Sequence, residues 1–152
     1  MTTEPAPSEV RRRVLSGHRA LREQLLELRR ECSELAGDGA ECLDALRLRA
    51  EAVKDALDAQ IDLEARVLIP VLEEIPGFGD IHAEDLTRHH VEQRRLYAEL
   101  VALIRSGRPN TEVAPEAQTL LDLLRREFVW EDRELLDPEV VKDDTIDISI
   151  GG

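Results

Sequence analysis

Four long stretches of the chain repeat apolar residues at intervals of three and four positions, and short segments containing Gly and Pro separate them. This spacing puts the apolar side chains on one face of an α-helix. We predict helices over about residues 8–36, 40–75, 81–106 and 115–137. Because long helices joined by short loops pack against their sequence neighbours, residues 8–138 are predicted to form an all-α, up-down-up-down four-helix bundle.

Length and composition agree with one helical domain. A chain of 152 residues has the size of a single domain, and a 3% aromatic content requires an aliphatic core. Eight Gly and seven Pro are too few for the tight turns of a β-sandwich or barrel. Residues 1–7 are predicted to be a flexible N-terminus and residues 139–152 an extended or disordered tail, in which Thr145–Ile150 alternates apolar and polar residues and could contact a protein partner.

The charge balance restricts the possible partners. The chain has 33 acidic and 20 basic side chains, and its net charge of -13 opposes the phosphate neutralisation that nucleic-acid binding requires. No apolar stretch is long enough to span a membrane, and the first ten residues lack the apolar core of a secretory signal. We therefore expect a cytoplasmic protein that binds neither nucleic acid nor membrane. Cys32 and Cys42 are expected to be reduced packing residues, with a disulfide between them as the alternative.

Polar residues interrupt the apolar stripe of every predicted helix at about the same level of the bundle. These residues are His18, Gln60, Glu64, His90 and one of the two neighbouring acids Glu131 and Asp132. A buried carboxylate without a partner costs several kcal/mol, so Glu64 requires a cation beside it, either a protonated histidine or a metal ion. Asp132 is preferred as the inward acid of the fourth helix, although Glu131 fits the helical phase equally well.

The two halves of the chain also resemble each other. His18 and His90 are each followed by Arg at the fourth position and Leu at the tenth, and an acid-x-x-aliphatic-Leu-x-Pro pattern begins at both Glu64 and Asp132. Two helical hairpins related by a pseudo-twofold axis bring their inward residues together at the centre of a bundle, as in carboxylate-bridged metal sites. We therefore predict that His18, Glu64, His90 and Asp132 bind a metal.

Other residues near this level are weaker candidates. Gln60 is a possible oxygen ligand, Glu131 is an alternative to Asp132, and His89 could donate a hydrogen bond to a metal ligand. Tyr97 is expected to pack in the core, although its phenol could instead donate to an oxygen ligand on a metal. The competing interpretation of all these residues is a hydrogen-bonded polar core without metal.

The residues around His18 and His90 and the acid-x-x-aliphatic-Leu-x-Pro helix ends resemble the hemerythrin-type HHE cation-binding domain over about residues 8–138. This resemblance implies a non-heme di-iron centre and a role in O2 or NO binding, iron handling or redox sensing. The histidine of the family's second helix falls on Gln60, and that of the fourth falls on Phe128. The resemblance thus implies a reduced site with one or two iron ions, for which zinc or manganese are alternatives.

Two functions remain open at this point. The first is a hemerythrin-like metalloprotein that binds or senses O2, NO or redox state, with a diatomic ligand or small oxidant as its partner. If this protein is an enzyme, the resemblance implies a non-heme iron oxidase. The second is a metal-free helical bundle that binds protein partners. The chain contains no Gly-rich phosphate loop and no Ser/His/Asp or Cys/His nucleophile pattern, so neither a kinase nor a hydrolase is predicted.

Overall fold

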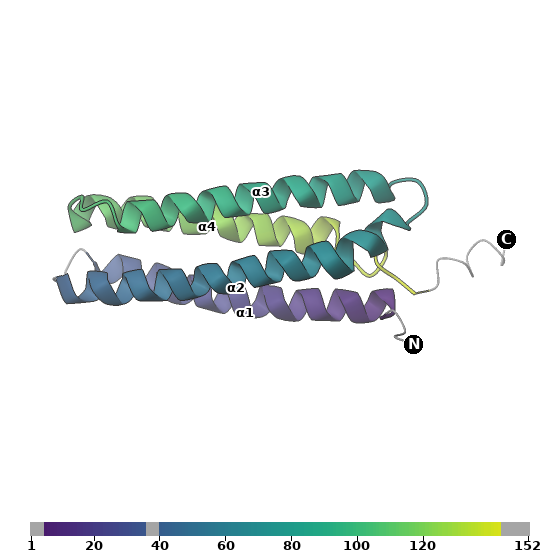
Figure 1. Ribbon diagram of the computed structural model, residues 1–152, viewed down its shortest axis with the longest axis horizontal. Helices are drawn as coiled ribbons and strands as arrows, with labels where there is room; N and C mark the ends of the chain where they lie inside the picture. The colour runs from purple at the N-terminus through teal and green to yellow at the C-terminus, as the bar shows by residue number, and fades with distance from the viewer. Residues whose placement is uncertain (1–4, 36–39, 144–152) are drawn as a thin grey trace.

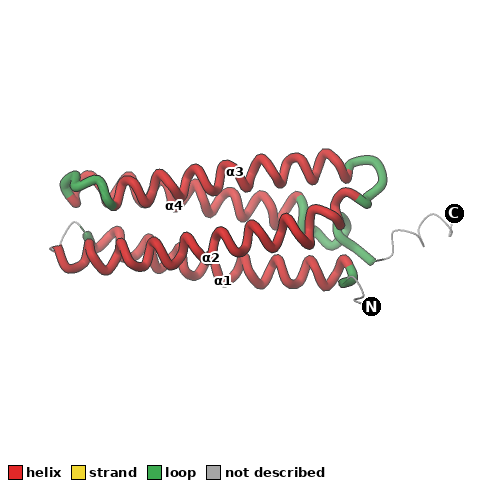
Figure 2. The backbone as a smooth tube through the Cα atoms, viewed as in Figure 1, coloured by secondary structure: helices red, strands yellow, loops and turns green. Residues whose placement is uncertain are grey.

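The described part of the chain forms an antiparallel bundle of four helices (Figure 1). The computed structural model describes residues 5–35 and 40–143. The helices are α1 (Pro7–Glu34), α2 (Ala40–Glu73), α3 (Gly79–Ile104) and α4 (Asn110–Glu134). Each helix packs against the next in sequence, and α1 packs against α4, so the bundle closes. The prediction of an all-α, up-down-up-down bundle is confirmed, and only helices and loops occur in the described residues (Figure 2).

Helix α4 begins earlier than the sequence suggested. The predicted start was near Pro115, but the helix begins at Asn110, where the Pro109 carbonyl accepts hydrogen bonds from the backbone of the first turn. Val113 and Ala114 explain the difference, because both side chains are buried against the core and their packing stabilises the additional turn. Pro115 therefore lies inside the helix rather than at its first position.

The chain that follows α4 folds back onto the start of α1. Val141 is buried, and its backbone N–H donates to the Asp137 carbonyl in a turn. Ser8 donates from its backbone N–H and its hydroxyl to the Asp143 carboxylate, at 2.9 and 2.7 Å. Residues 139–143 thus differ from the extended or disordered tail that the sequence predicted, because Val141 completes the core at this end. The alternating segment Thr145–Ile150 lies outside the described residues, as does most of the predicted flexible N-terminus.

The interior has two apolar clusters with a layer of polar side chains between them. The short apolar cluster lies near the N-terminus of α1 and includes Val10, Val14, Leu68, Leu86 and Leu135. The long apolar cluster fills the rest of the bundle, from Leu21 to Phe128. The polar layer consists of the buried polar residues His18, Gln60, Glu64, His90, Gln93 and Glu131. Every helix thus carries polar residues into the interior at one level.

The two cysteines and the apolarity of the helices were also subjects of sequence predictions. Cys32 is buried in the long apolar cluster, where burial raises the pKa of its thiol to about 12, and Cys42 packs against the same cluster. Both cysteines therefore contribute to packing. Within the described ranges, none of the helices combines the length and apolarity needed to cross a membrane.

Candidate metal centre

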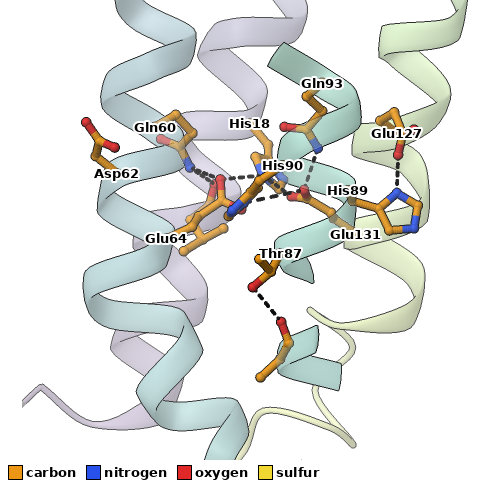
Figure 3. A network of polar contacts seen from close by, with 12 residues as sticks. His18, Gln60, Asp62, Glu64, Thr87, His89, His90, Gln93, Glu127 and Glu131 are labelled. Atoms are coloured by element: carbon orange, nitrogen blue, oxygen red, sulfur yellow. Dashed lines mark hydrogen bonds and ion pairs between the residues drawn. The ribbon is translucent and has the colours of Figure 1, made fainter. Parts of the chain in front are cut away.

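The four principal residues of the polar layer come from four different helices. His18 lies on α1, Glu64 on α2, His90 on α3 and Glu131 on α4, and their side chains converge at the centre of the bundle (Figure 3). Each occupies a position in the apolar stripe of its helix, so the packing that buries the neighbouring apolar residues also turns it inward. His18 is 0% exposed, and the most exposed of the four, His90, is only 5% exposed.

The two carboxylates each face both imidazoles. Nε2 of His18 lies 3.1 Å from Oε2 of Glu64 and 2.8 Å from Oε2 of Glu131. Nε2 of His90 lies 3.1 Å from Oε1 of Glu64 and 3.9 Å from Oε1 of Glu131. Each glutamate therefore presents one oxygen to His18 and the other to His90, which is the arrangement of two bridging carboxylates.

Three of these groups form a set of donor atoms suited to a cation. One ligand atom each from His18, Glu64 and Glu131 lie within 4.8 Å of one another. Oε2 of Glu131 is buried, and although it lies close to Nε2 of His18, it makes no hydrogen bond with any described residue. A single imidazole N–H cannot satisfy two carboxylate oxygens, whereas a metal ion at this point would contact both. The donor set therefore fits a metal.

The structure corrects the choice between the two neighbouring acids of α4. Glu131 is 1% exposed and joins the buried cluster, whereas the Asp132 side chain is 18% exposed and lies outside it. Adjacent helical residues differ by roughly 100° in direction, so only one of the two can point inward. The inward stripe of α4 keeps its three- and four-residue spacing through Leu121, Leu124, Phe128, Glu131 and Leu135.

Asp132 nevertheless contacts the site, at the ring nitrogen of His18 that faces away from the two glutamates. Its Oδ1 lies 2.7 Å from Nδ1 of His18, and its Oδ2 accepts a hydrogen bond from Nη2 of Arg22. A carboxylate on Nδ1 fixes the orientation of an imidazole and leaves Nε2 to face the centre, which is the usual support for a metal-ligating histidine. Asp132 therefore positions His18 rather than joining the donor set.

Two carboxamides hold the carboxylates. Nε2 of Gln60 donates to Oε2 of Glu64 at 3.0 Å and to the Val14 carbonyl at 3.3 Å. Nε2 of Gln93 donates to Oε1 of Glu131 at 2.6 Å. Gln60 thus acts as a hydrogen-bond donor here, not as the oxygen ligand that the sequence suggested. Gln93 was not predicted to belong to the site, although its place in the apolar stripe of α3 was the available signal.

The space around His18 is closely filled. The Phe128 ring lies beside the His18 ring, with 5.1 Å between their centroids. The Gln60 carboxamide lies directly over the neighbouring residue Gly17, where an added Cβ would clash with Oε1 of Gln60. Gly17 therefore creates the room in which Gln60 reaches Glu64.

Electrostatic contacts within the cluster shift the pKa values of its titratable groups. Burial acts to lower the pKa of His18, but its contacts with Asp132, Glu131 and Glu64 outweigh burial and hold this pKa well above its ordinary value. Burial acts to raise the pKa of Glu64, yet His18 and His90 keep it below the usual range. Burial and the Glu64 charge raise the pKa of Glu131. The metal-free cluster therefore favours an imidazolium at His18.

The two remaining sequence candidates lie outside the cluster. His89 stacks on Trp130, with ring centroids 3.6 Å apart, and its Nδ1 hydrogen-bonds to Glu127. Tyr97 is buried in the long apolar cluster, and its hydroxyl donates to the Ala50 carbonyl. Neither contacts the donor set in the structure.

Comparison with known proteins places the chain in a family. The model of the family described as the hemerythrin HHE cation-binding domain matches residues 11–137, which is most of the chain and includes every residue of the polar layer. No curated protein and no solved structure matched the chain.

Proposed function

The chain belongs to the hemerythrin HHE cation-binding family, and from this premise we propose that its polar layer binds divalent transition-metal ions, with iron as the expected metal. The observation that carries the proposal is the convergence of His18 Nε2 with one oxygen each from Glu64 and Glu131, of which the Glu131 oxygen has no hydrogen-bond donor among the described residues. Imidazole together with carboxylate suits iron, and also zinc and manganese.

The two faces of the carboxylates support a site for one or two ions. His18 with Oε2 of Glu64 and Oε2 of Glu131 would hold the first ion. His90 with the Oε1 atoms of the same glutamates would hold the second, and its longer contact of 3.9 Å to Glu131 makes that set less complete. Asp132, Gln60 and Gln93 would keep the donor atoms oriented.

This site suits small ligands. When bound, an iron centre with few protein ligands supplies open positions for a diatomic molecule or a small oxidant. The protein's own contribution is a buried surround, because the short and long apolar clusters flank the polar layer and exclude bulk water. We therefore propose O2, NO or redox sensing or binding as the physiological role. An oxidase reaction on a small substrate would need the same metal.

A second function is supported by one specific observation. His18 contacts three carboxylates, and its raised pKa favours an imidazolium that can take the place of a metal cation. The cluster could therefore be a closed ion network in a metal-free bundle that binds a protein partner. This alternative predicts a stable fold without any metal.

Metal analysis of the purified protein separates these functions. The protein would be expressed in medium supplemented with iron and zinc, and compared with His18→Ala, Glu64→Ala and the control Asp62→Ala. Asp62 lies on the same helix as Glu64, but its side chain is 70% exposed and points away from the cluster (Figure 3).

We expect one or two metal ions per chain in the wild type and in Asp62→Ala, and loss of metal in the other two variants. Circular dichroism would confirm that each variant is helical. No metal in the folded wild type would refute the proposal and favour the metal-free bundle.

A further inference from the structure

A small pocket lies on the outer face of the bundle between α1 and α4. It has a volume of about 120 Å³ and is separate from the polar layer. We call it the α1–α4 pocket, and its lining residues are Arg22, Leu25, Leu26, Arg29, Leu121, Asp122, Arg125 and Val129. A neighbouring depression on the same face adds Arg126.

The pocket is basic in an otherwise acidic chain of net charge -13. Asp122 is the one carboxylate in its lining, and it is neutralised by Arg29, whose Nε and Nη2 donate to its two oxygens at 3.0 and 3.4 Å. Neither Arg125 nor Arg126 forms an ion pair with any residue that the structure describes. Arg125 in the pocket and Arg126 in the neighbouring depression therefore carry charges that no ion pair with a described residue balances.

The floor of the pocket is apolar. Leu25 and Leu121 are buried beneath it. Leu26 is 54% exposed, so it presents an apolar side chain to solvent. Val129 of α4 is half-buried and also lines the pocket. An apolar floor under a rim of arginines combines two kinds of binding surface, one for hydrocarbon and one for an anion.

We propose that the α1–α4 pocket binds a small organic carboxylate with an apolar body of about the size of benzoate. The planar guanidinium fork of Arg125, which lines the pocket, matches the two oxygens of a carboxylate, and Arg126 in the neighbouring depression adds positive charge. The leucines and Val129 cover the apolar body. A cavity of about 150 Å³ accommodates benzene, so a pocket of about 120 Å³ that is open on one side limits the body to a single ring or a short chain.

Arg22 also lines the pocket, but it is unsuitable as the test residue. It donates to Asp132, which contacts His18, so its replacement would disturb the polar layer as well. Arg125 has no such contact among the described residues, and Arg133 on the same helix is an exposed arginine outside the pocket. Arg125→Gln and Arg133→Gln therefore remove the same charge from two places.

The test is a titration of the full-length, metal-free protein with sodium benzoate, followed by two-dimensional NMR of the backbone amides. Because metal is absent, the result does not depend on the proposed function. We expect saturable shifts at Leu26 and Val129, with a dissociation constant on the order of 1 mM. Arg125→Gln should weaken binding about tenfold, and Arg133→Gln should leave it within a factor of about two.

Two comparison ligands test the chemical class. Benzyl alcohol lacks the charge and acetate lacks the ring, so each should bind at least about tenfold more weakly than benzoate. The proposal is overturned if benzoate gives no saturable shift up to roughly 50 mM, if both arginine variants weaken it equally, or if benzyl alcohol binds as well as benzoate.

Discussion

The α1–α2 and α3–α4 hairpins each place one histidine and one glutamate in the polar layer, but they hold their histidines differently. His18 is 0% exposed, and its Nδ1 is held by Asp132 while its Nε2 lies within 3.1 Å of both glutamates. His90 is 5% exposed, and its Nε2 lies within 3.1 Å of Glu64 alone. The repeated sequence pattern thus produces two unequal halves.

The cause of the inequality lies in the residue after each glutamate. Asp132 follows Glu131 and reaches across to His18, whereas Ala65 follows Glu64 and has no polar group to offer His90. The carboxamides differ as well, since Gln60 and Glu64 share one helix while Gln93 reaches Glu131 from a neighbouring helix. The His18 half is therefore the better prepared of the two for the proposed metal binding.

The stability of the metal-free protein should respond most strongly to the difference between the two histidines. His18→Leu removes the cation between three carboxylates, and removing one partner of a buried ionic cluster should lower the free energy of unfolding by about 3–5 kcal/mol. His90→Leu should lower the free energy of unfolding by only about 1–2 kcal/mol, because His90 has one close carboxylate partner, Glu64. Urea denaturation measures both values. Equal losses in the two variants would contradict the inequality of the halves.

The second effect is on metal affinity. Asp132→Ala removes the support of His18, and loss of such a partner weakens metal binding by about 10–100-fold. Asp122→Ala is the matched control, since it also removes an α4 carboxylate paired with an α1 arginine but touches no histidine. Competition with a chelator of known affinity measures the difference. If Asp122→Ala weakens binding as much, Asp132 has no specific role.

The third effect is the pH dependence of stability in the metal-free protein. The pKa of His18 is raised in the folded state, so its contribution is complete below the ordinary value of 6.5 and is lost as the pH rises through the folded pKa. Glu131, whose pKa burial raises, acts in the same direction. For the His18 proton, stability should fall with rising pH by at most about 1.4 kcal/mol per unit. Chemical denaturation at several pH values should show this slope in the wild type and a smaller slope in His18→Leu.

The smallest effect concerns the packing of Gln60. Gly17→Ala gains helix propensity but places a Cβ against the Gln60 carboxamide, so we expect a net loss of about 1 kcal/mol. In a Gln60→Ala background the carboxamide is absent, so Gly17→Ala should raise the free energy of unfolding by about 0.5–1 kcal/mol. A double-mutant cycle by denaturation measures this change of sign. If the effect of Gly17→Ala has the same sign in both backgrounds, Gly17 is not required to make room for the Gln60 carboxamide.

Much of the site could be predicted from periodicity. An isolated polar residue in an apolar stripe must be buried with its neighbours, so His18, Glu64 and His90 were identified correctly as inward residues. Glu131 and Asp132 could not be separated in this way, because both lie near the inward edge of α4 and only the rotation of that helix against its neighbours decides which is buried. Whether these residues bind a metal stays a prediction.

Whether a glutamine of the polar layer donates or accepts a hydrogen bond could not be predicted from the sequence. Gln60 can donate or accept, and its role as a donor follows from the Glu64 carboxylate and the Val14 carbonyl that face it. The part played by Gln93 likewise depends on a glutamate from another helix. Spacing along one helix carries no information about such contacts.

The four helices, their antiparallel order and the level at which polar side chains enter the core can all be predicted from the amino-acid sequence, because they follow from the helical repeat and from where the apolar stripes are interrupted. The packing of the four helices is needed to show that Glu131 joins the cluster, that Asp132 supports His18 and that the two halves are unequal. The physical reason is that a helix fixes directions relative to its own axis, whereas the contacts between four axes depend on how the helices rotate and pack together.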